Sequence, residues 1–345
     1  MSIRVAINGA GRIGRAFFNM ASDNENIEIV AVNDLADIED IAYLLNYDSA
    51  YGRREKKVTV SEAKDKLYDG DREIAFFQEK DPQALPWGEL DVDVAVEATG
   101  IFTTFKDAGL HVAAGAKRVV ISAPAKDEPE NDTQKTILMG ANEAELSTCS
   151  VSSNASCTTN AGAPLVQILH DSVGIEKALL NTIHAYTSSQ SLVDSFSKKN
   201  PRLGRAAAQN IVPTSTGAAK ATTKVITDLD GSFDGIALRV PVIAGSIADI
   251  TFLASRDTSA EEVNDILRNA AESDQWKSVF TVTDEPLVSS DIQGAAYGSI
   301  ADLSFTRVVG GNLVKVLAWY DNEKGYTHTL LQHVIRTGEY AKEQA

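Results

Sequence analysis

The stretch IRVAINGAGRIGRAFFNMAS, residues 3–22, decides the fold of the first part of this chain. It opens with apolar residues interrupted only by Arg4, which is typical of a buried strand. A glycine-rich turn follows, and from Ile13 to Met20 the apolar residues recur at helical spacing. The stretch therefore predicts a strand, a tight turn and a helix.

The turn carries Gly9, Gly11 and Gly14 in the pattern GxGxxG. Between a strand and a helix, such glycines let the backbone approach a pyrophosphate, and the helix N-terminus supplies N–H groups and the positive end of its dipole. In another context the same pattern would be an ordinary turn. Here it predicts a dinucleotide-binding site of the Rossmann type.

Asp34 lies 20 residues beyond Gly14, at the end of a second predicted strand, IEIVAVND (27–34). A carboxylate there accepts hydrogen bonds from both hydroxyls of an adenosine ribose and repels a 2′-phosphate. The alternative is a helix N-cap within NDLAD, and the two roles are compatible. We therefore predict NAD as the cofactor rather than NADP.

The hydrophobic pattern of the sequence differs between the first and the later part of the chain. DVDVAVEATG (91–100) and KRVVISAP (117–124) read as further buried strands, so about the first 150 residues look doubly wound. Long alternating segments follow, which predict an antiparallel sheet with one solvated or interface face. They are KALLNTIHAYT (177–187), FDGIALRVPV (233–242), SIADITFLAS (246–255) and GNLVKVLAWYDN (311–322). Residues 327–345 predict a final amphipathic helix.

Composition limits the class of protein. A chain of 345 residues suits two domains, and no window reaches the roughly 18 apolar residues of a membrane-spanning helix. A net charge of −16 argues against sequence-independent nucleic-acid binding. Since the first strand starts at Ile3, no signal peptide fits ahead of it, and we expect a cytoplasmic protein. The two cysteines and five histidines show no zinc-ligand spacing, so we predict no metal site.

SNASCTTNAG (153–162) places Cys157 at the start of a predicted helix. Helix N–H groups stabilise a thiolate there, so we expect a lowered thiol pKa and a nucleophile; a small buried cysteine is the alternative. Cys149 lacks this setting. The candidate base is His184, which ends a predicted strand. The other histidines lie on predicted helices, where structural or solvated roles are expected: His111, His170, His328 and His333.

Two features indicate an anionic substrate. PTSTGAAKA (213–221) offers hydroxyls and a glycine before a helical run, and ALRVPV (237–242) places Arg239 in an apolar strand. The alternative for Arg239 is a structural ion pair with a carboxylate.

Together these motifs resemble the phosphorylating glyceraldehyde-3-phosphate dehydrogenase family. The resemblance rests on NGAGRIGR, SNASCTTN, HAYT, STGAAKA, RVPV and WYDNEKGY, whose order spans nearly the whole chain. It implies an α/β fold: a Rossmann NAD-binding domain (1–156, completed by the C-terminal helix 321–345) and a mixed α/β catalytic domain with an antiparallel sheet (157–320). It also implies a homotetramer.

The resemblance further implies that Cys157 attacks the aldehyde of glyceraldehyde 3-phosphate and that His184 accepts a proton as hydride leaves for NAD. Inorganic phosphate would then release 1,3-bisphosphoglycerate from a thioester. Implied phosphate contacts are Thr187 and Arg239 for the substrate phosphate, and Ser156, Thr158, Thr216 and Gly217 for the attacking phosphate. Asn322 would hold the nicotinamide carboxamide. The implied cofactor contacts are Gly9, Gly11, Arg12, Ile13, Gly14, Asp34, Thr99, Ser122 and Asn322.

The sequence departs from the family pattern at a few positions. Ala161 replaces a second cysteine, which removes one route to a disulfide. Lys80 and Lys324 replace an arginine and an aromatic residue, and Ser195 with Phe196 stands in a loop that helps to choose the cofactor, so some NADP use is an open alternative. Two rival functions stay open at this point: an erythrose-4-phosphate dehydrogenase, and a non-catalytic NAD-binding regulatory protein.

Overall fold

The computed structural model describes residues 2–198 and 200–343. The chain forms two compact units. The first unit consists of Met1–Ile137, Asn142–Ala155 and Thr327–Ala345, and the second of Leu138–Ala141 and Ser156–Tyr326. Residues 344 and 345 of the predicted final helix lie outside the described residues.

The first unit contains a nine-stranded sheet in the order β10-β11-β9-β8-β1-β2-β7-β6-β5. All neighbours are parallel except β5 with β6 and β6 with β7. The strands are β1 (Ile3–Asn8), β2 (Ile27–Asn33), β5 (Val58–Val60), β6 (Lys66–Asp69), β7 (Arg72–Phe77), β8 (Val94–Glu97), β9 (Arg118–Ile121), β10 (Gln134–Thr136) and β11 (Val151–Ser153). A separate two-stranded hairpin joins β3 (Tyr47–Asp48) to β4 (Gly52–Arg53).

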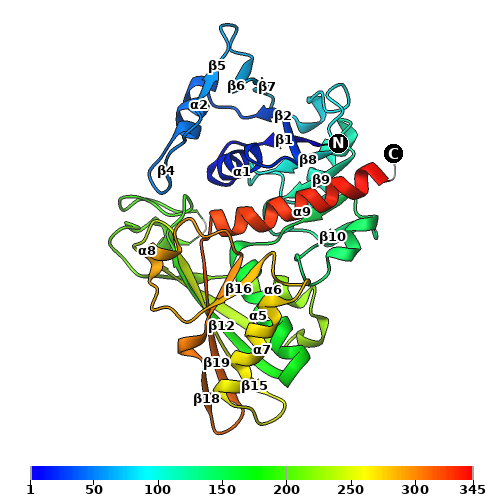
Figure 1. The fold of residues 1–345 in the computed structure, drawn as a ribbon. Helices are drawn as coiled ribbons and strands as arrows, with labels where there is room; N and C mark the ends of the chain where they lie inside the picture. The colour runs from blue at the N-terminus through cyan, green and yellow to red at the C-terminus, as the bar shows by residue number, and fades with distance from the viewer. Residues whose placement is uncertain (1, 199, 344–345) are drawn as a thin grey trace. The chain divides into compact units, whose positions relative to one another are not determined.

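The helices of this unit bury apolar faces against the sheet. They are α1 (Arg12–Ser22), α2 (Ile38–Asn46), α3 (Phe105–Ala108), α4 (Leu110–Ala113) and most of α9 (Lys324–Glu343), with 3₁₀ turns at Pro82–Ala84 and Glu143–Thr148. Phe17 and Phe18 of α1 share one core with Leu330 and Val334 of α9, drawn in red in Figure 1. The final helix therefore packs into the core of the first unit.

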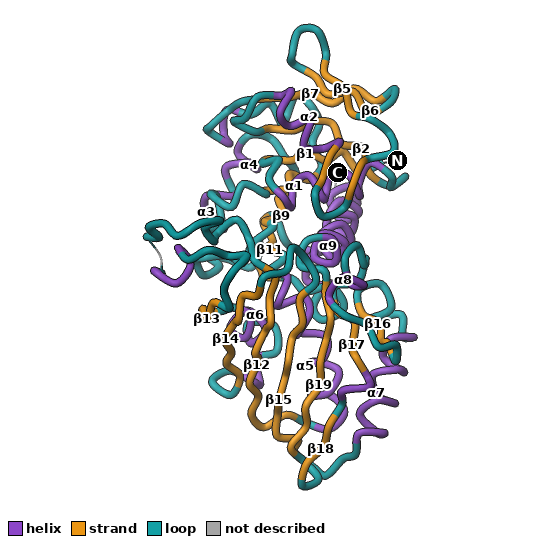
Figure 2. Tube along the Cα trace, turned by 90° about the vertical axis from the view of Figure 1, so that its left-hand side faces the viewer, coloured by secondary structure: helices purple, strands orange, loops and turns teal. Residues whose placement is uncertain are grey.

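The second unit is built on an eight-stranded sheet, β13-β14-β12-β15-β19-β17-β16, with β18 paired to β19. Its strands are β12 (Ile175–Ala185), β13 (Val212–Ser215), β14 (Phe233–Val240), β15 (Ser246–Ala254), β16 (Phe280–Thr283), β17 (Ser299–Asp302), β18 (Arg307–Val309) and β19 (Leu313–Tyr320). Figure 2 shows the long strands side by side. Most pairs are antiparallel as predicted, but β12 with β14 and β16 with β17 are parallel.

Helices cover one face of this sheet. They are α5 (Cys157–Val173), α6 (Ala218–Thr223) and α7 (Ala260–Glu272), and the short α8 (Ser289–Ile292) packs near β15 and β19. Three 3₁₀ turns span Pro201–Gly204, Thr227–Leu229 and Leu303–Phe305. The opposite face leaves apolar side chains exposed, namely Leu179, Ile236 and Leu313. The sheet thus has one helix-covered face and one open face.

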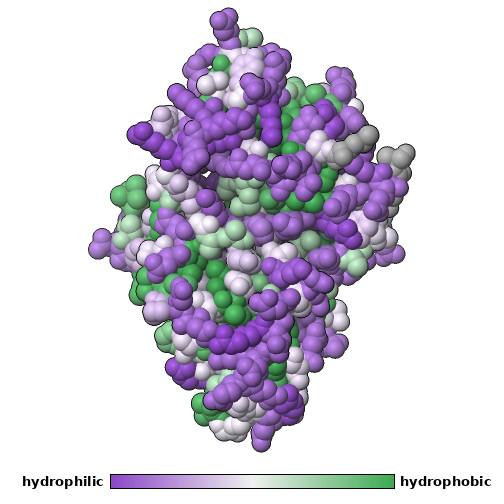
Figure 3. Space-filling view, viewed as in Figure 1, coloured by the Kyte–Doolittle hydropathy of each residue, from purple (hydrophilic) through white to green (hydrophobic). Residues whose placement is uncertain are grey.

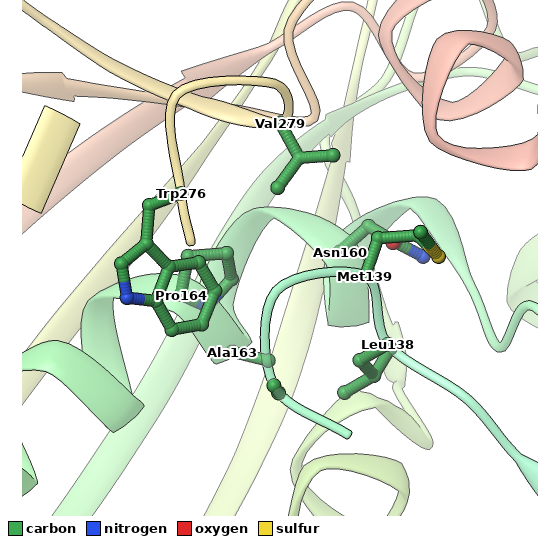
Figure 4. Close-up of a pocket in the computed structure, with 8 residues that line it drawn as sticks. Leu138, Met139, Asn160, Ala163, Pro164, Trp276 and Val279 are labelled. Carbon is green, nitrogen blue, oxygen red and sulfur yellow. The ribbon is translucent and has the colours of Figure 1, made fainter. Parts of the chain in front are cut away.

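A narrow crevice in the second unit fixes the position of α5. Trp276 and Pro164 line one end of it, and Met139 and Asn160 line the other (Figure 4). Gly140 has a φ of +85°, and a β carbon on it would lie 2.6 Å from the Trp276 ring. The side chains fill the crevice so closely that no water-sized space remains, so it packs the helix rather than binding a ligand.

The surface agrees with the acidic composition. Figure 3 shows a mostly hydrophilic face interrupted by separate hydrophobic patches. No helix within residues 2–198 and 200–343 has both the length and the apolar character needed to cross a membrane.

Candidate active site and cofactor turn

The glycine turn of the first unit is shaped by close backbone packing. Gly9 has a φ of +99°, and a β carbon there would lie 2.6 Å from the Thr99 nitrogen. A β carbon on Gly14 would lie 1.9 Å from the Gly9 oxygen. A β carbon on Gly11 would meet no heavy atom within 4 Å, so the space in front of the α1 N-terminus is open. This geometry suits a pyrophosphate at the helix N-terminus.

Asp34 joins this turn to the end of β2. Its Oδ2 accepts the Ala10 N–H at 2.7 Å and its Oδ1 accepts the Ala36 N–H at 2.9 Å. The N-cap of α2 is Asp37, whose side chain accepts the Glu39 N–H, so Asp34 is not the helix cap. The partly exposed carboxylate has acceptor capacity left for ribose hydroxyls.

The other predicted cofactor residues of this unit lie around the same strand ends. Arg12 forms an ion pair with Asp48. The Thr99 hydroxyl donates to Glu97 and accepts the Ile101 N–H, so this side chain points into the protein. Ser122 follows β9, and its N–H donates to the Glu97 carbonyl at 2.9 Å. Ile13, in the first turn of α1, packs against the core.

In the second unit, Cys157 is the first residue of α5, as predicted. The N-cap is Ser156, whose hydroxyl accepts the Thr159 N–H at 3.1 Å. Ala155, two residues before Cys157, has a φ of +52°, a backbone conformation that residues other than glycine seldom adopt. Cys157 as a whole residue is only partly exposed.

The thiol faces an imidazole. Cys157 Sγ lies 3.3 Å from His184 Nε2, at the end of β12. His184 Nδ1 lies 2.6 Å from the Ala185 carbonyl oxygen, which can only accept. Arg239 NH1, which can only donate, also lies 3.1 Å from Nδ1, so the two neighbours of this nitrogen favour opposite tautomers. In either tautomer Nε2 is the nitrogen directed at the thiol. This is the arrangement of a nucleophile and its base.

Burial controls the protonation of both groups. It lowers the pKa of His184 to about 3, with the nearby Arg239 charge adding to the effect. Burial also raises the pKa of Cys157, outweighing Arg239 and the Thr158 hydrogen bonds, which lower it. The expected lowered thiol pKa is therefore wrong for this geometry. Burial thus favours the uncharged form of both the thiol and the imidazole.

Arg239 reaches the site because β12 and β14 are parallel neighbours in which it sits directly beside His184. Its NH1 donates to the Ala185 carbonyl at 3.1 Å and to Thr187 Oγ1 at 3.3 Å. Among the residues that the structure describes, no carboxylate lies within ion-pair distance of Arg239, and its buried Nε has no hydrogen-bond partner. The alternative of a structural ion pair is thus not met there, and the geometry favours an external anion.

The remaining predicted phosphate contacts are placed as follows. The Ser156 hydroxyl is hydrogen-bonded to Thr159, and Thr158 Oγ1 turns toward the Tyr320 hydroxyl at 2.9 Å. Thr216 Oγ1 accepts the Ala218 N–H at 3.2 Å. Gly217 caps α6, which packs against α5 and β14. The structure thus joins Cys157, His184, Thr187 and Arg239 by direct contacts, while Thr158 points away from solvent.

Comparisons with known proteins identify the family of this chain. Residues 3–105 match the model of the glyceraldehyde 3-phosphate dehydrogenase NAD binding domain, and residues 156–322 match that of the C-terminal domain. A glyceraldehyde-3-phosphate dehydrogenase of Streptomyces coelicolor is 46% identical over 341 residues, covering 98% of this chain and 99% of that protein. The chain belongs to the glyceraldehyde-3-phosphate dehydrogenase family.

Two further glyceraldehyde-3-phosphate dehydrogenases agree. The protein of Geobacillus stearothermophilus and protein 1 of Bacillus subtilis are each 44% identical over 333 residues, covering 96% of this chain and 97% of each relative. These matches confirm the predicted family and its NAD cofactor, and they do not favour the erythrose or the non-catalytic alternative. The residues around the glycine turn and Asp34 fit that cofactor.

Sequence reasoning missed two residues of this dehydrogenase site. The Tyr320 hydroxyl bonds both Thr158 Oγ1 (2.9 Å) and Thr182 Oγ1 (2.7 Å), which ties the start of α5 to the strand that carries His184. Ser246 accepts the Ala185 N–H at 3.0 Å and donates to Asn322 Oδ1 at 3.0 Å. Tyr320 lies within the WYDNEKGY motif, which was the available signal; nothing in the sequence marks Ser246.

Proposed function

We propose that Cys157 and His184 carry out the oxidative phosphorylation of D-glyceraldehyde 3-phosphate to 1,3-bisphosphoglycerate. The family name describes a dehydrogenase of this triose phosphate with an NAD binding domain, and we place the reaction in glycolysis and gluconeogenesis. The observation that supports the residue assignment is the 3.3 Å contact between Sγ and Nε2, beside an arginine with no carboxylate partner among the described residues.

The first step is attack of the Cys157 sulfur on the aldehyde carbon. The thiol proton passes to His184 Nε2 as the C–S bond forms, and the aldehyde oxygen becomes the hydroxyl of a hemithioacetal by taking that proton back. Because the His184 ring is held by the Ala185 carbonyl, its Nε2 stays in line with the sulfur.

The second step oxidises the hemithioacetal to a thioester. The carbon loses a hydride and the hydroxyl loses a proton, which His184 Nε2 accepts again. When bound, NAD supplies the hydride acceptor. Inorganic phosphate then attacks the thioester carbon, the C–S bond breaks, and the proton held by His184 returns to the sulfur.

Anion recognition follows from the same geometry. Arg239 and Thr187 bind the substrate phosphate, because the guanidinium is the fixed positive charge beside the thiol and the hydroxyl lies in hydrogen-bond contact with it. Ser156, Thr158, Thr216 and Gly217 bind the attacking phosphate through hydroxyl and N–H groups at the starts of α5 and α6. Gly9, Gly11, Gly14 and Asp34, with Arg12, Ile13, Thr99, Ser122 and Asn322, hold the cofactor.

The test is the initial rate of NADH formation from glyceraldehyde 3-phosphate and NAD, with and without inorganic phosphate. Sustained turnover that requires phosphate is expected. Equal turnover without phosphate would mean that water resolves the thioester, and no turnover would overturn the assignment. A Cys157→Ser variant is the matched control, because it keeps the shape of the site and removes the thioester.

The proposal extends to organisation. We assign residues 1–156 and 321–345 to the NAD-binding domain and 157–320 to the catalytic domain. We propose a homotetramer in the cytoplasm, supported by the open face of the second-unit sheet, where Leu179 is 67% and Ile236 55% exposed. Light scattering of the purified chain tests this, because a monomer at micromolar concentration would contradict it.

A further inference from the structure

A buried chain of hydrogen bonds crosses the carboxyl ends of the first-unit strands, and the proposed reaction does not use it. Its members are Trp87, His111, Glu97, Asn8 and Asn33, each at most 4% exposed. Asn8 ends β1, Asn33 ends β2 and Glu97 ends β8, so the chain spans the edge from which the glycine turn projects. Buried polar groups of this kind need every partner in place.

One arm of the chain runs from Trp87. Its indole N–H donates to His111 Nδ1 at 2.9 Å, and His111 Nε2 lies 3.1 Å from Glu97 Oε2. An indole N–H can only donate, so Nδ1 must accept. The ring proton therefore sits on Nε2, which donates to the carboxylate.

The other arm starts at the backbone of Glu79, whose N–H donates to Asn33 Oδ1 at 2.8 Å. Asn33 Nδ2 then donates to Asn8 Oδ1 at 2.7 Å, and Asn8 Nδ2 donates to Glu97 Oε2 at 2.6 Å. Each amide orientation is set by the group before it. This arm also points toward the carboxylate.

Glu97 is the point where all donors converge. Its Oε2 accepts from Asn8 and His111, and its Oε1 accepts the Thr99 N–H at 2.8 Å and the Thr99 hydroxyl. Both arms end in groups that can only donate, an indole and a backbone N–H. The direction of donation in neither arm can therefore reverse. Only a carboxylate without a proton at position 97 can accept all of these hydrogen bonds.

We propose that Glu97 is a positioning residue for the cofactor, which acts by holding Thr99 against the Gly9 turn within this directional network. Thr99 and Gly9 pack backbone to backbone, since a β carbon on Gly9 would lie 2.6 Å from the Thr99 nitrogen. The two hydrogen bonds from Thr99 to Glu97 fix that approach. This inference rests on the proposed cofactor role of the Gly9 turn and names the residue that sets its shape.

The tautomer of His111 is the first test. Solid-state NMR of the 15N-histidine-labelled protein at pH 7 reports which ring nitrogen carries the proton, and loss of the signal in His111→Gln assigns it among the five histidines. A protonated Nε2 and a bare Nδ1 are expected. A proton on Nδ1 would overturn the directional network.

The second test is Glu97→Gln. This substitution places an amide NH2 group where Asn8 and His111 need a hydrogen-bond acceptor. We expect NAD affinity, measured by calorimetric titration, to fall about 10-fold, and KM for NAD to rise with kcat changed less than about 3-fold. Trp87→Phe removes the terminal donor, so in Trp87→Phe/Glu97→Gln the His111 ring can reverse and accept from the new amide. The Asn8 amide still donates toward the substituted side chain, so the double variant should recover only part of the lost affinity and bind NAD more tightly than Glu97→Gln but more weakly than Trp87→Phe alone.

These measurements separate the positioning role from the proposed reaction. Wild-type NAD affinity in Glu97→Gln, or a double variant that binds as weakly as Glu97→Gln, overturns the positioning role even if turnover is normal. The expected affinity pattern together with no NADH formation from the triose overturns the reaction alone. Thermal unfolding of each variant shows that the fold is intact.

Discussion

His184 and His333 make an instructive comparison. Both are buried, and burial lowers the pKa of each to about 3. His333, in α9, is enclosed by two side chains: its Nδ1 lies 3.0 Å from Asn154 Oδ1 and its Nε2 lies 2.8 Å from Ser152 Oγ. His184 Nδ1 contacts the Ala185 carbonyl and Arg239 NH1, and its other nitrogen faces the Cys157 thiol.

The difference teaches that a shifted pKa does not by itself identify a catalytic base. The same burial produces the same shift in a structural histidine and in a candidate base. What distinguishes them is the partner of the second nitrogen. In His333 this partner is the Ser152 hydroxyl, and in His184 it is the thiol of the candidate nucleophile Cys157.

The largest expected effect is on catalysis at His184. His184→Asn removes the base beside Cys157, and general-base catalysis contributes about 10² to 10⁴ in rate. We expect kcat for NADH formation to fall by about that factor while the melting temperature changes by only a few degrees. Retention of more than a tenth of the wild-type kcat would erase the contrast between the two histidines.

The opposite pattern is expected at His333. His333→Ala removes the two hydrogen bonds that the imidazole makes with Ser152 and Asn154 and opens a cavity, so the free energy of unfolding should fall by about 2–4 kcal/mol. Urea denaturation measures this loss. The folded fraction should keep kcat within about 3-fold of wild type, and His333→Gln, which preserves some hydrogen bonding, should lose less stability. A large loss of kcat in folded protein would assign His333 a role in the site.

The pH dependence of stability gives a further test of the two buried histidines. A histidine with a folded pKa near 3 and an unfolded pKa near 6.5 stabilises the fold above pH 6.5, and this stabilisation is lost as pH falls toward 3. At pH 5 the loss is about 2 kcal/mol for each such group. Urea denaturation measures how much the free energy of unfolding falls between pH 7 and pH 5. This fall should be about 2 kcal/mol smaller in His333→Gln than in wild type. Equal losses would contradict the shift assigned to His333.

The smallest effect is expected at Ser246, which links the His184 strand to Asn322. Ser246→Ala removes one hydrogen bond to each, and a net loss of about 1 kcal/mol corresponds to about a 5-fold rise in KM for NAD. Ser246→Thr keeps the hydroxyl and is the matched control. If both variants behave alike, the hydroxyl does not orient Asn322.

Features that depend on short stretches of sequence could be predicted. The strand, turn and helix at residues 3–22 and the start of α5 at Cys157 follow from short stretches of sequence, and the structure confirms them. Each depends on periodicity or on residues within a few positions of one another.

Features that depend on distant pairing were not predictable. His184 and Arg239 are neighbours only because β12 and β14 pair in parallel, whereas alternation along each strand predicted antiparallel neighbours. The raised pKa of Cys157 arises from burial by surrounding segments, which outweighs the local helix terminus that the sequence displays. The network that converges on Glu97 joins side chains from five separate segments, those of Asn8, Asn33, Trp87, Glu97 and His111.

The threading of the chain also fixes the order in which its parts are completed during synthesis. The first unit takes residues from both sides of the second, and Leu330 and Val334 of α9 belong to the same core as β1. A ribosome must therefore finish the whole second unit before the core begun at Ile3 receives its last helix. The glycine turn is made before any residue of the second unit, yet the core beneath it closes only after residues 327–343 have left the exit tunnel.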